Sequence, residues 1–106
     1  MVAEIDVEEL AERIAQGATL IDVREVGEYH EGHVPGAHLF ALSGLEQSVA
    51  DLPDASPLLV ICKSGARSLR AAEFLAGEGR DALNVTGGTL AWIASGREVA
   101  TGMERG

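Results

Sequence analysis

Cysteine and basic residues are scarce in this sequence. A single cysteine, Cys62, excludes an internal disulfide. Eight Lys and Arg stand against 17 Asp and Glu, which gives a formal net charge of −9. This acidity argues against nucleic acid or an anionic membrane as a partner, because both attract basic patches. No apolar run approaches about 18 residues and no basic start leads into an apolar segment, so we expect a cytoplasmic protein without a membrane span.

Length and composition indicate one small domain over residues 1–106. Hydrophobic residues make up 46% of the chain, which is enough for one ordinary core and argues against disorder. The sequence contains no internal repeat, linker or low-complexity stretch. Residues 101–106 are expected to form a loose tail.

Apolar strands alternate with helical patterns along the chain. The expected strands are residues 2–5, 19–23, 37–40, 58–61 and 82–85. The expected helices are residues 7–16, 24–29, 43–52, 67–76 and 88 to near 96. Asp6 with Glu9 and Ser43 with Glu46 have the spacing of capping boxes at helix starts. Because the strands are continuous apolar runs separated by helices, the pattern predicts an α/β fold whose parallel sheet is covered on both faces.

Cys62 directly follows the apolar run 58–61 and is the first residue of a basic loop that also contains a glycine. The loop reads Cys62-Lys63-Ser64-Gly65-Ala66-Arg67-Ser68, and a helical pattern follows in which Leu69, Ala72 and Leu75 form the expected inner stripe. Free amides and the helix dipole favour an anion at such a helix start, and Lys63 and Arg67 add positive charge. Ligands of parallel sheets bind beyond the carboxyl ends of strands. The segment therefore indicates a reactive thiolate rather than a structural cysteine.

The other residues of the loop are expected to support the sulfur. The amides of residues 63–68 can form an anion-binding nest, and Gly65 supplies backbone freedom. Ser64 and Ser68 are interpreted as residues that cap the helix start rather than as catalytic groups.

Residues outside this loop are interpreted as structural. Asp22 and Arg24 lie at the end of the strand at 19–23, where they can reach the same edge of the sheet as Cys62, and we favour a structural ion pair for them. His33 is interpreted as a turn residue, and Trp92 as a core residue. No metal or cofactor is expected, because the candidate ligands do not have a zinc-binding spacing; these are His30, His33, His38 and Cys62.

Four segments in this order resemble the rhodanese-like sulfurtransferases over nearly the whole chain. They are Asp22-Val23-Arg24 with Glu28-Tyr29, Gly32 to Ala37, Cys62 to Arg67, and Gly87-Gly88 with Trp92 and Gly96. The resemblance implies a single-domain member with a three-layer fold, in which helices cover both faces of a five-stranded parallel sheet. It also implies sulfane-sulfur transfer, in which the Cys62 thiolate takes sulfur from a donor, becomes a persulfide and passes the sulfur on.

By the same resemblance, Lys63 and Arg67 orient an anionic donor and stabilise its leaving group. Loops of this family that take thiosulfate tend to be basic, so thiosulfate or a polysulfide is the expected donor. Cyanide, small thiols and thioredoxin-like or persulfide-exchanging proteins are the expected acceptors.

Two other functions remain open at this point. Cysteine phosphatases and some arsenate reductases also place a cysteine and an arginine around an anion-binding loop. The phosphatases with this fold have five residues between the two, whereas this chain has four, Lys63 to Ala66, and a smaller loop suits sulfane sulfur better than a phosphoryl group. The other alternative is a non-enzymatic persulfide carrier or sensor, which a complete loop does not exclude.

Overall fold

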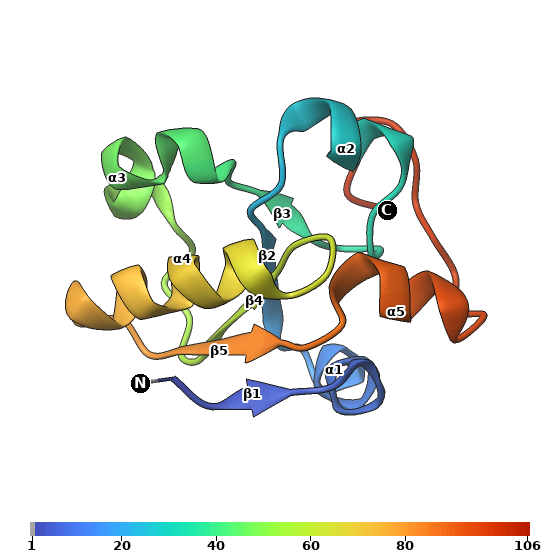
Figure 1. Ribbon diagram of the computed structural model, residues 1–106, viewed down its shortest axis with the longest axis horizontal. Coiled ribbons are helices and arrows are strands. Elements are labelled where there is room, and N and C mark those ends of the chain that lie inside the picture. Colours follow the sequence, from blue (N-terminus) through green and yellow to red (C-terminus); the bar gives the residue numbers. More distant parts are fainter. Residues whose placement is uncertain (1) are drawn as a thin grey trace.

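A five-stranded parallel sheet forms the middle layer of the protein, as the computed structural model of residues 2–106 shows (Figure 1). The strands are β1 (Glu4–Ile5), β2 (Thr19–Asp22), β3 (His38–Leu39), β4 (Leu58–Ile61) and β5 (Ala82–Val85). Their order in the sheet is β1-β5-β4-β2-β3, and each neighbouring pair is parallel. The predicted α/β fold is confirmed.

Helices cover both faces of this sheet. They are α1 (Val7–Ala15), α2 (Val26–Glu31), α3 (Leu45–Ser48), α4 (Ala66–Gly77) and α5 (Gly88–Ala94). One apolar cluster joins the sheet to α3 and α4, and a second joins its other face to α1, α2 and α5. No helix in the described part of the chain is long and apolar enough to cross a bilayer.

Alternation of side chains along β4 decides the face on which Cys62 lies. Leu58 and Val60 belong to the cluster under α3 and α4, whereas Leu59 and Ile61 belong to the opposite cluster. Cys62 comes two residues after Val60 and packs in the same cluster. The sulfur is therefore on the side of the sheet that α4 covers.

The predicted capping boxes have different outcomes. Asp6 caps α1 as expected by accepting a hydrogen bond from the Glu9 amide (2.9 Å). The Ser43–Glu46 box is wrong, because Ser43 lies inside a 3₁₀ turn (Leu42–Gly44) and Gly44 precedes α3 without a side-chain cap. The Ser43 hydroxyl donates instead to Glu25 (3.0 Å). In place of one helix over 43–52, the chain forms this turn, α3 and a second 3₁₀ turn, Val49–Asp51.

Helix α4 is rotated relative to the predicted inner stripe. Ala72 and Leu75 are buried as expected, but Leu69 is only partly buried, and Ser68 and Ala71 face the sheet. This rotation brings the Ser68 hydroxyl to the buried side of the helix, toward the cysteine.

The C-terminal tail, expected to be loose, lies against residues 30–38. The Gly102 amide donates to the His30 carbonyl (2.8 Å), and the Gly36 amide donates to the Arg105 carbonyl (2.7 Å). The ring nitrogens of His33 face the carbonyl oxygens of Tyr29 (2.8 Å) and Glu104 (2.9 Å). His33 is not the predicted turn residue: it is buried, pairs with Ala100 in an isolated antiparallel bridge just before the turn at Pro35 and Gly36, and holds the tail.

Candidate active site

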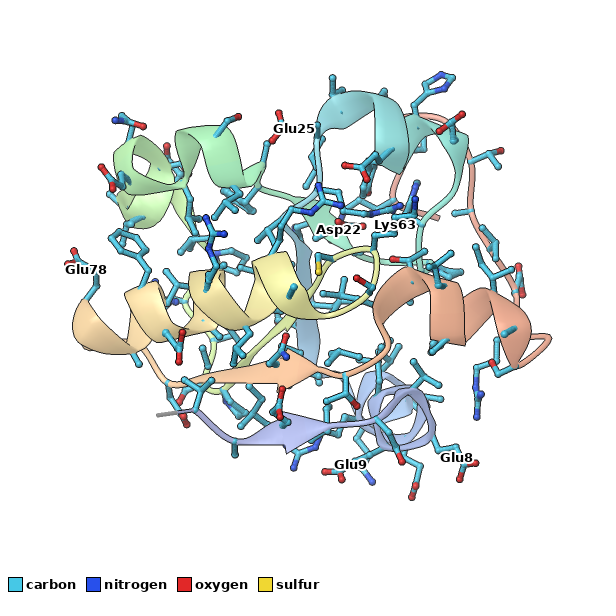
Figure 2. All side chains as sticks on the ribbon, viewed as in Figure 1. Glu8, Glu9, Asp22, Glu25, Lys63 and Glu78 are labelled. Atoms are coloured by element: carbon cyan, nitrogen blue, oxygen red, sulfur yellow. The ribbon has the colours of Figure 1, made fainter. Side chains whose placement is uncertain are left out.

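The loop from Cys62 to Gly65 joins the carboxyl end of β4 to the start of α4. In Figure 2, Lys63 lies at the rim where the loop turns, and Glu78 lies at the opposite end of α4. The side chain of Lys63 is exposed, whereas Cys62 is only 1% exposed. The sulfur is therefore shielded, and the exposed Lys63 cation lies beside it in the loop.

Hydrogen-bond donors converge on this buried sulfur. The Gly65 amide lies 3.1 Å from Sγ, and the Ser68 hydroxyl lies 3.2 Å from it. Gly65 has a φ of 112°, a conformation that glycine adopts without the steric penalty of a side chain. Burial raises the pKa of the Cys62 thiol, but hydrogen bonds from Ser68, Gly65 and Ser64 outweigh burial, so the pKa lies below its usual value. This is the environment of a nucleophilic thiolate.

Ser68 does not cap the helix, contrary to the sequence-based interpretation. Gly65 occupies the N-cap position of α4 and makes no side-chain cap hydrogen bond, and the Ser68 hydroxyl lies against the sulfur. Ser64 is exposed and contributes through its amide. Hydrogen bonds from Ser68, Gly65 and Ser64 therefore stabilise the thiolate, and the nearby Arg67 charge attracts it as well.

Arg67 is engaged by a residue that the sequence did not single out for the site. Its Nη1 and Nη2 donate to the two carboxylate oxygens of Glu28 at 2.8 Å each. The hydrogen bond from Arg67 outweighs burial and holds the pKa of Glu28 at about 2. Glu28 is therefore ionised at neutral pH and occupies the guanidinium that was expected to orient a donor.

Asp22 and Arg24 form the structural ion pair that the sequence predicted. Arg24 Nη2 lies 2.8 Å from Asp22 Oδ2, and both residues are buried. The same Nη2 donates to the Gly32 carbonyl (2.7 Å), directly after α2. Because α2 carries Glu28, this pair fixes the element that positions the partner of Arg67.

Two backbone amides at the start of α5 donate hydrogen bonds to the loop that contains Cys62. The Thr89 amide donates to the Cys62 carbonyl (2.9 Å), and the Leu90 amide donates to the Lys63 carbonyl (3.0 Å). A Cβ on Gly88 would lie 2.6 Å and 2.5 Å from these same two oxygens. The sequence indicated only a turn at Gly88, and nothing local in it shows that another backbone approaches this closely.

Gly88→Ala is expected to displace the loop and destabilise the fold by at least about 2 kcal/mol. The alanine would be strained at a φ of 60° and would overlap two backbone oxygens that cannot swing away. Thermal unfolding and the rate of Cys62 alkylation measure the two effects. Gly77→Ala is the matched control, because its Cβ meets nothing within 4 Å in α4. Equal losses in the two variants would contradict the close approach.

A hollow of about 210 Å³ lies beside the loop. Its lining includes charged groups, among them Lys63 and Glu28, and two apolar residues of α5, Leu90 and Ile93. Both apolar side chains are about half exposed. The rim of the site thus offers a cation next to an apolar surface.

Comparison with known proteins shows the family to which the chain belongs. The family described as "Rhodanese-like domain" matches residues 6–95. A "Sulfurtransferase" from Allochromatium vinosum is 33% identical over 99 residues, which cover 91% of this chain and 92% of that protein. The chain belongs to the rhodanese-like sulfurtransferase family.

Solved structures show the same fold. A rhodanese-related protein from Thermoplasma volcanium has a TM-score of 0.87 at 32% identity, with 96% of this chain and 99% of that chain covered. A thiosulfate sulfurtransferase from Pseudomonas aeruginosa has a TM-score of 0.81 at 29% identity, where the match covers 97% of this chain and 20% of the longer protein.

Proposed function

We propose that this protein transfers sulfane sulfur from thiosulfate or a polysulfide to a thiophilic acceptor through a persulfide on Cys62. The observation that carries the proposal is the pair of donors on the buried sulfur, the Gly65 amide and the Ser68 hydroxyl. Such a cradle stabilises a thiolate before the reaction and a persulfide anion after it. A phosphoryl group needs a wider loop than the four residues between Cys62 and Arg67.

The reaction consists of two displacements at sulfur. The Cys62 thiolate attacks the sulfane sulfur of thiosulfate, a new S–S bond forms, and sulfite leaves with the electron pair of the broken S–S bond. A nucleophile such as cyanide or a thiolate then attacks the outer sulfur of the persulfide, and the Cys62 thiolate leaves. Each step conserves charge and needs no cofactor.

Incubation with thiosulfate tests this function directly. We expect intact-protein mass spectrometry to show the addition of one sulfur atom to Cys62, and we expect cyanide to remove it as thiocyanate. Persulfide formation without multiple turnover would instead support the carrier function. Absence of the added sulfur together with hydrolysis of an aryl phosphate would overturn the proposal in favour of a phosphatase.

Donor binding depends on the charges at the rim. Glu28 neutralises Arg67, and Lys63 forms no ion pair within residues 2–106. Lys63 is therefore the cation that is free to attract thiosulfate. Arg67 can bind the anion only after its ion pair with Glu28 breaks. Glu28 thus acts against the binding of a dianion.

Glu28→Gln is expected to lower KM for thiosulfate about three- to tenfold, because it frees the Arg67 guanidinium for the donor. Steady-state thiocyanate formation measures the change. Glu31→Gln is the control, since Glu31 lines the same hollow but makes no ion pair with Arg67. A KM that falls equally in both variants would mean that the loss of one negative charge near the site, and not the release of Arg67, improves thiosulfate binding.

We also propose small thiols and thioredoxin-like proteins as acceptors and the cytoplasm as the location. Exposed Leu90 and Ile93 next to Lys63 suit contact with a protein acceptor. A free, buried thiol that must ionise is suited to a reducing compartment.

A further inference from the structure

We propose that Asn84 restrains the ionisation of Cys62 by competing with the sulfur for the single proton of the Ser68 hydroxyl. Asn84 touches neither the sulfur nor a substrate, so it is a positioning residue that acts through Ser68. The inference rests on the proposed function only in that Cys62 is the nucleophile.

The Ser68 hydroxyl has more acceptors than it can serve. Asn84 Oδ1 lies 2.5 Å from Oγ, Cys62 Sγ lies at 3.2 Å and the Gly65 carbonyl oxygen at 3.3 Å. A hydroxyl donates one hydrogen bond at a time. Ser68 is 0% exposed and Asn84 is 1% exposed, so bulk solvent does not satisfy the group that is left without the proton.

The orientation of the Asn84 amide is fixed by its other neighbours. Nδ2 lies 2.7 Å from Glu4 Oε2 and 3.2 Å from the Gly65 carbonyl oxygen, and both of these atoms only accept. A flipped amide would place Oδ1 against both acceptors. Asn84 therefore presents an oxygen to Ser68 and has no proton to offer it.

Asn84 makes the Ser68 hydroxyl a weaker stabiliser of the thiolate than it would be alone, while the Gly65 amide donates to the sulfur in either case. While Cys62 is protonated, its S–H can donate to Ser68 Oγ while the Ser68 proton goes to Asn84. Once the sulfur is ionised, the Ser68 proton either turns to sulfur and leaves Asn84 Oδ1 unpaired, or stays with Asn84 and leaves an oxygen lone pair facing the anion. Both outcomes carry a penalty in a buried site.

The register of the sheet places Asn84 beside Ser68, and this position creates the competition for the proton. Asn84 pairs with Val60, two residues before Cys62, and it faces α4 in alternation with Val85, which packs on the opposite side. A restraint of this kind is compatible with catalysis, since the nucleophilicity of a thiolate falls as its pKa falls. Ser68 and Asn84 together would then balance the amount of thiolate against its reactivity.

Charged groups near the site remain in place when these two residues are replaced. They are Arg67 on α4 with Glu28 on α2, Lys63 in the loop, the Asp22–Arg24 pair at the end of β2, and Glu4 on β1 behind Asn84. Variants of Ser68 and Asn84 therefore test the hydrogen bonds at constant charge.

A double-mutant cycle on the pH dependence of iodoacetamide alkylation at Cys62 tests the proposal. Ser68→Ala should move the midpoint of the profile up, and Asn84→Ala should move it down, with about three- to tenfold more thiolate below the wild-type midpoint. In Ser68→Ala/Asn84→Ala the midpoint should match that of Ser68→Ala alone, because the competition for a proton disappears with the Ser68 hydroxyl. Asn84→Leu, of similar volume, replaces Asn84→Ala if the latter does not fold.

An unchanged or higher midpoint in the folded Asn84 variant would overturn the proposal. So would a double variant whose midpoint differs from that of Ser68→Ala. A merely structural role for Asn84 would lower thermal stability without moving the midpoint downward. Alkylation requires no sulfur donor, so these outcomes are separate from the thiosulfate test of the proposed function.

Discussion

Cys62→Ser is expected to reduce persulfide formation and thiocyanate release to background. The serine hydroxyl does not ionise near neutral pH, and its oxygen cannot exchange sulfane sulfur as a thiolate does. The oxygen can still accept from the Gly65 amide and the Ser68 hydroxyl, which lie 3.1 Å and 3.2 Å from the present sulfur. The fold should therefore survive, with a stability within about 1–2 kcal/mol of the wild type.

Intact-protein mass spectrometry after thiosulfate treatment measures the loss of persulfide formation. Thermal unfolding measures the stability of the variant. Ser64→Ala is the matched control: it removes an exposed hydroxyl from the same loop and keeps the backbone amide, so persulfide formation should persist. Turnover that persists in Cys62→Ser would show that the sulfur does not pass through this residue.

The site was predictable from the sequence where its chemistry is local. The strand end, the glycine and the helix start at Cys62 follow one another directly, and the Asp22–Arg24 pair is two residues apart. The alternation of apolar strands with helices was likewise sufficient for the α/β sheet with both faces covered. These features follow from short-range stereochemistry and periodicity.

Contacts between distant segments were not predictable in the same way. Arg67 meets Glu28 across 39 residues, and Ser68 meets Asn84 across 16. The first contact arises because adjacent β2 and β4 run parallel and end at one edge, and the second because β5 pairs with β4 in a particular register. The helical pattern at 67–76 also did not determine which side of α4 faces the sheet to better than one residue. That rotation determines whether Ser68 points to solvent or to the sulfur.

Asp22→Ala is expected to destabilise the protein by about 3–5 kcal/mol, because it leaves a buried guanidinium with one remaining acceptor, the Gly32 carbonyl. For a domain of about this size the loss corresponds to a fall in Tm on the order of 10–30 °C, measured by thermal unfolding. Sulfur transfer should fall as well at temperatures where part of the protein is unfolded, since only the folded chain holds the Cys62 loop.

The exposed pair Arg13–Glu9 on α1 provides the control, because its N–O distance is 2.8 Å, the same as in Arg24–Asp22. The side chains of Arg13 and Glu9 are 35% and 46% exposed, against 6% and 0% for Arg24 and Asp22. Water can solvate either partner of the exposed pair, so Glu9→Ala should cost about 0.5 kcal/mol or less. Similar losses in the two variants would mean that burial does not set the strength of the Asp22 effect. Replacing both members, Asp22→Ala with Arg24→Leu, should recover part of the loss, since no uncompensated charge then remains inside the protein.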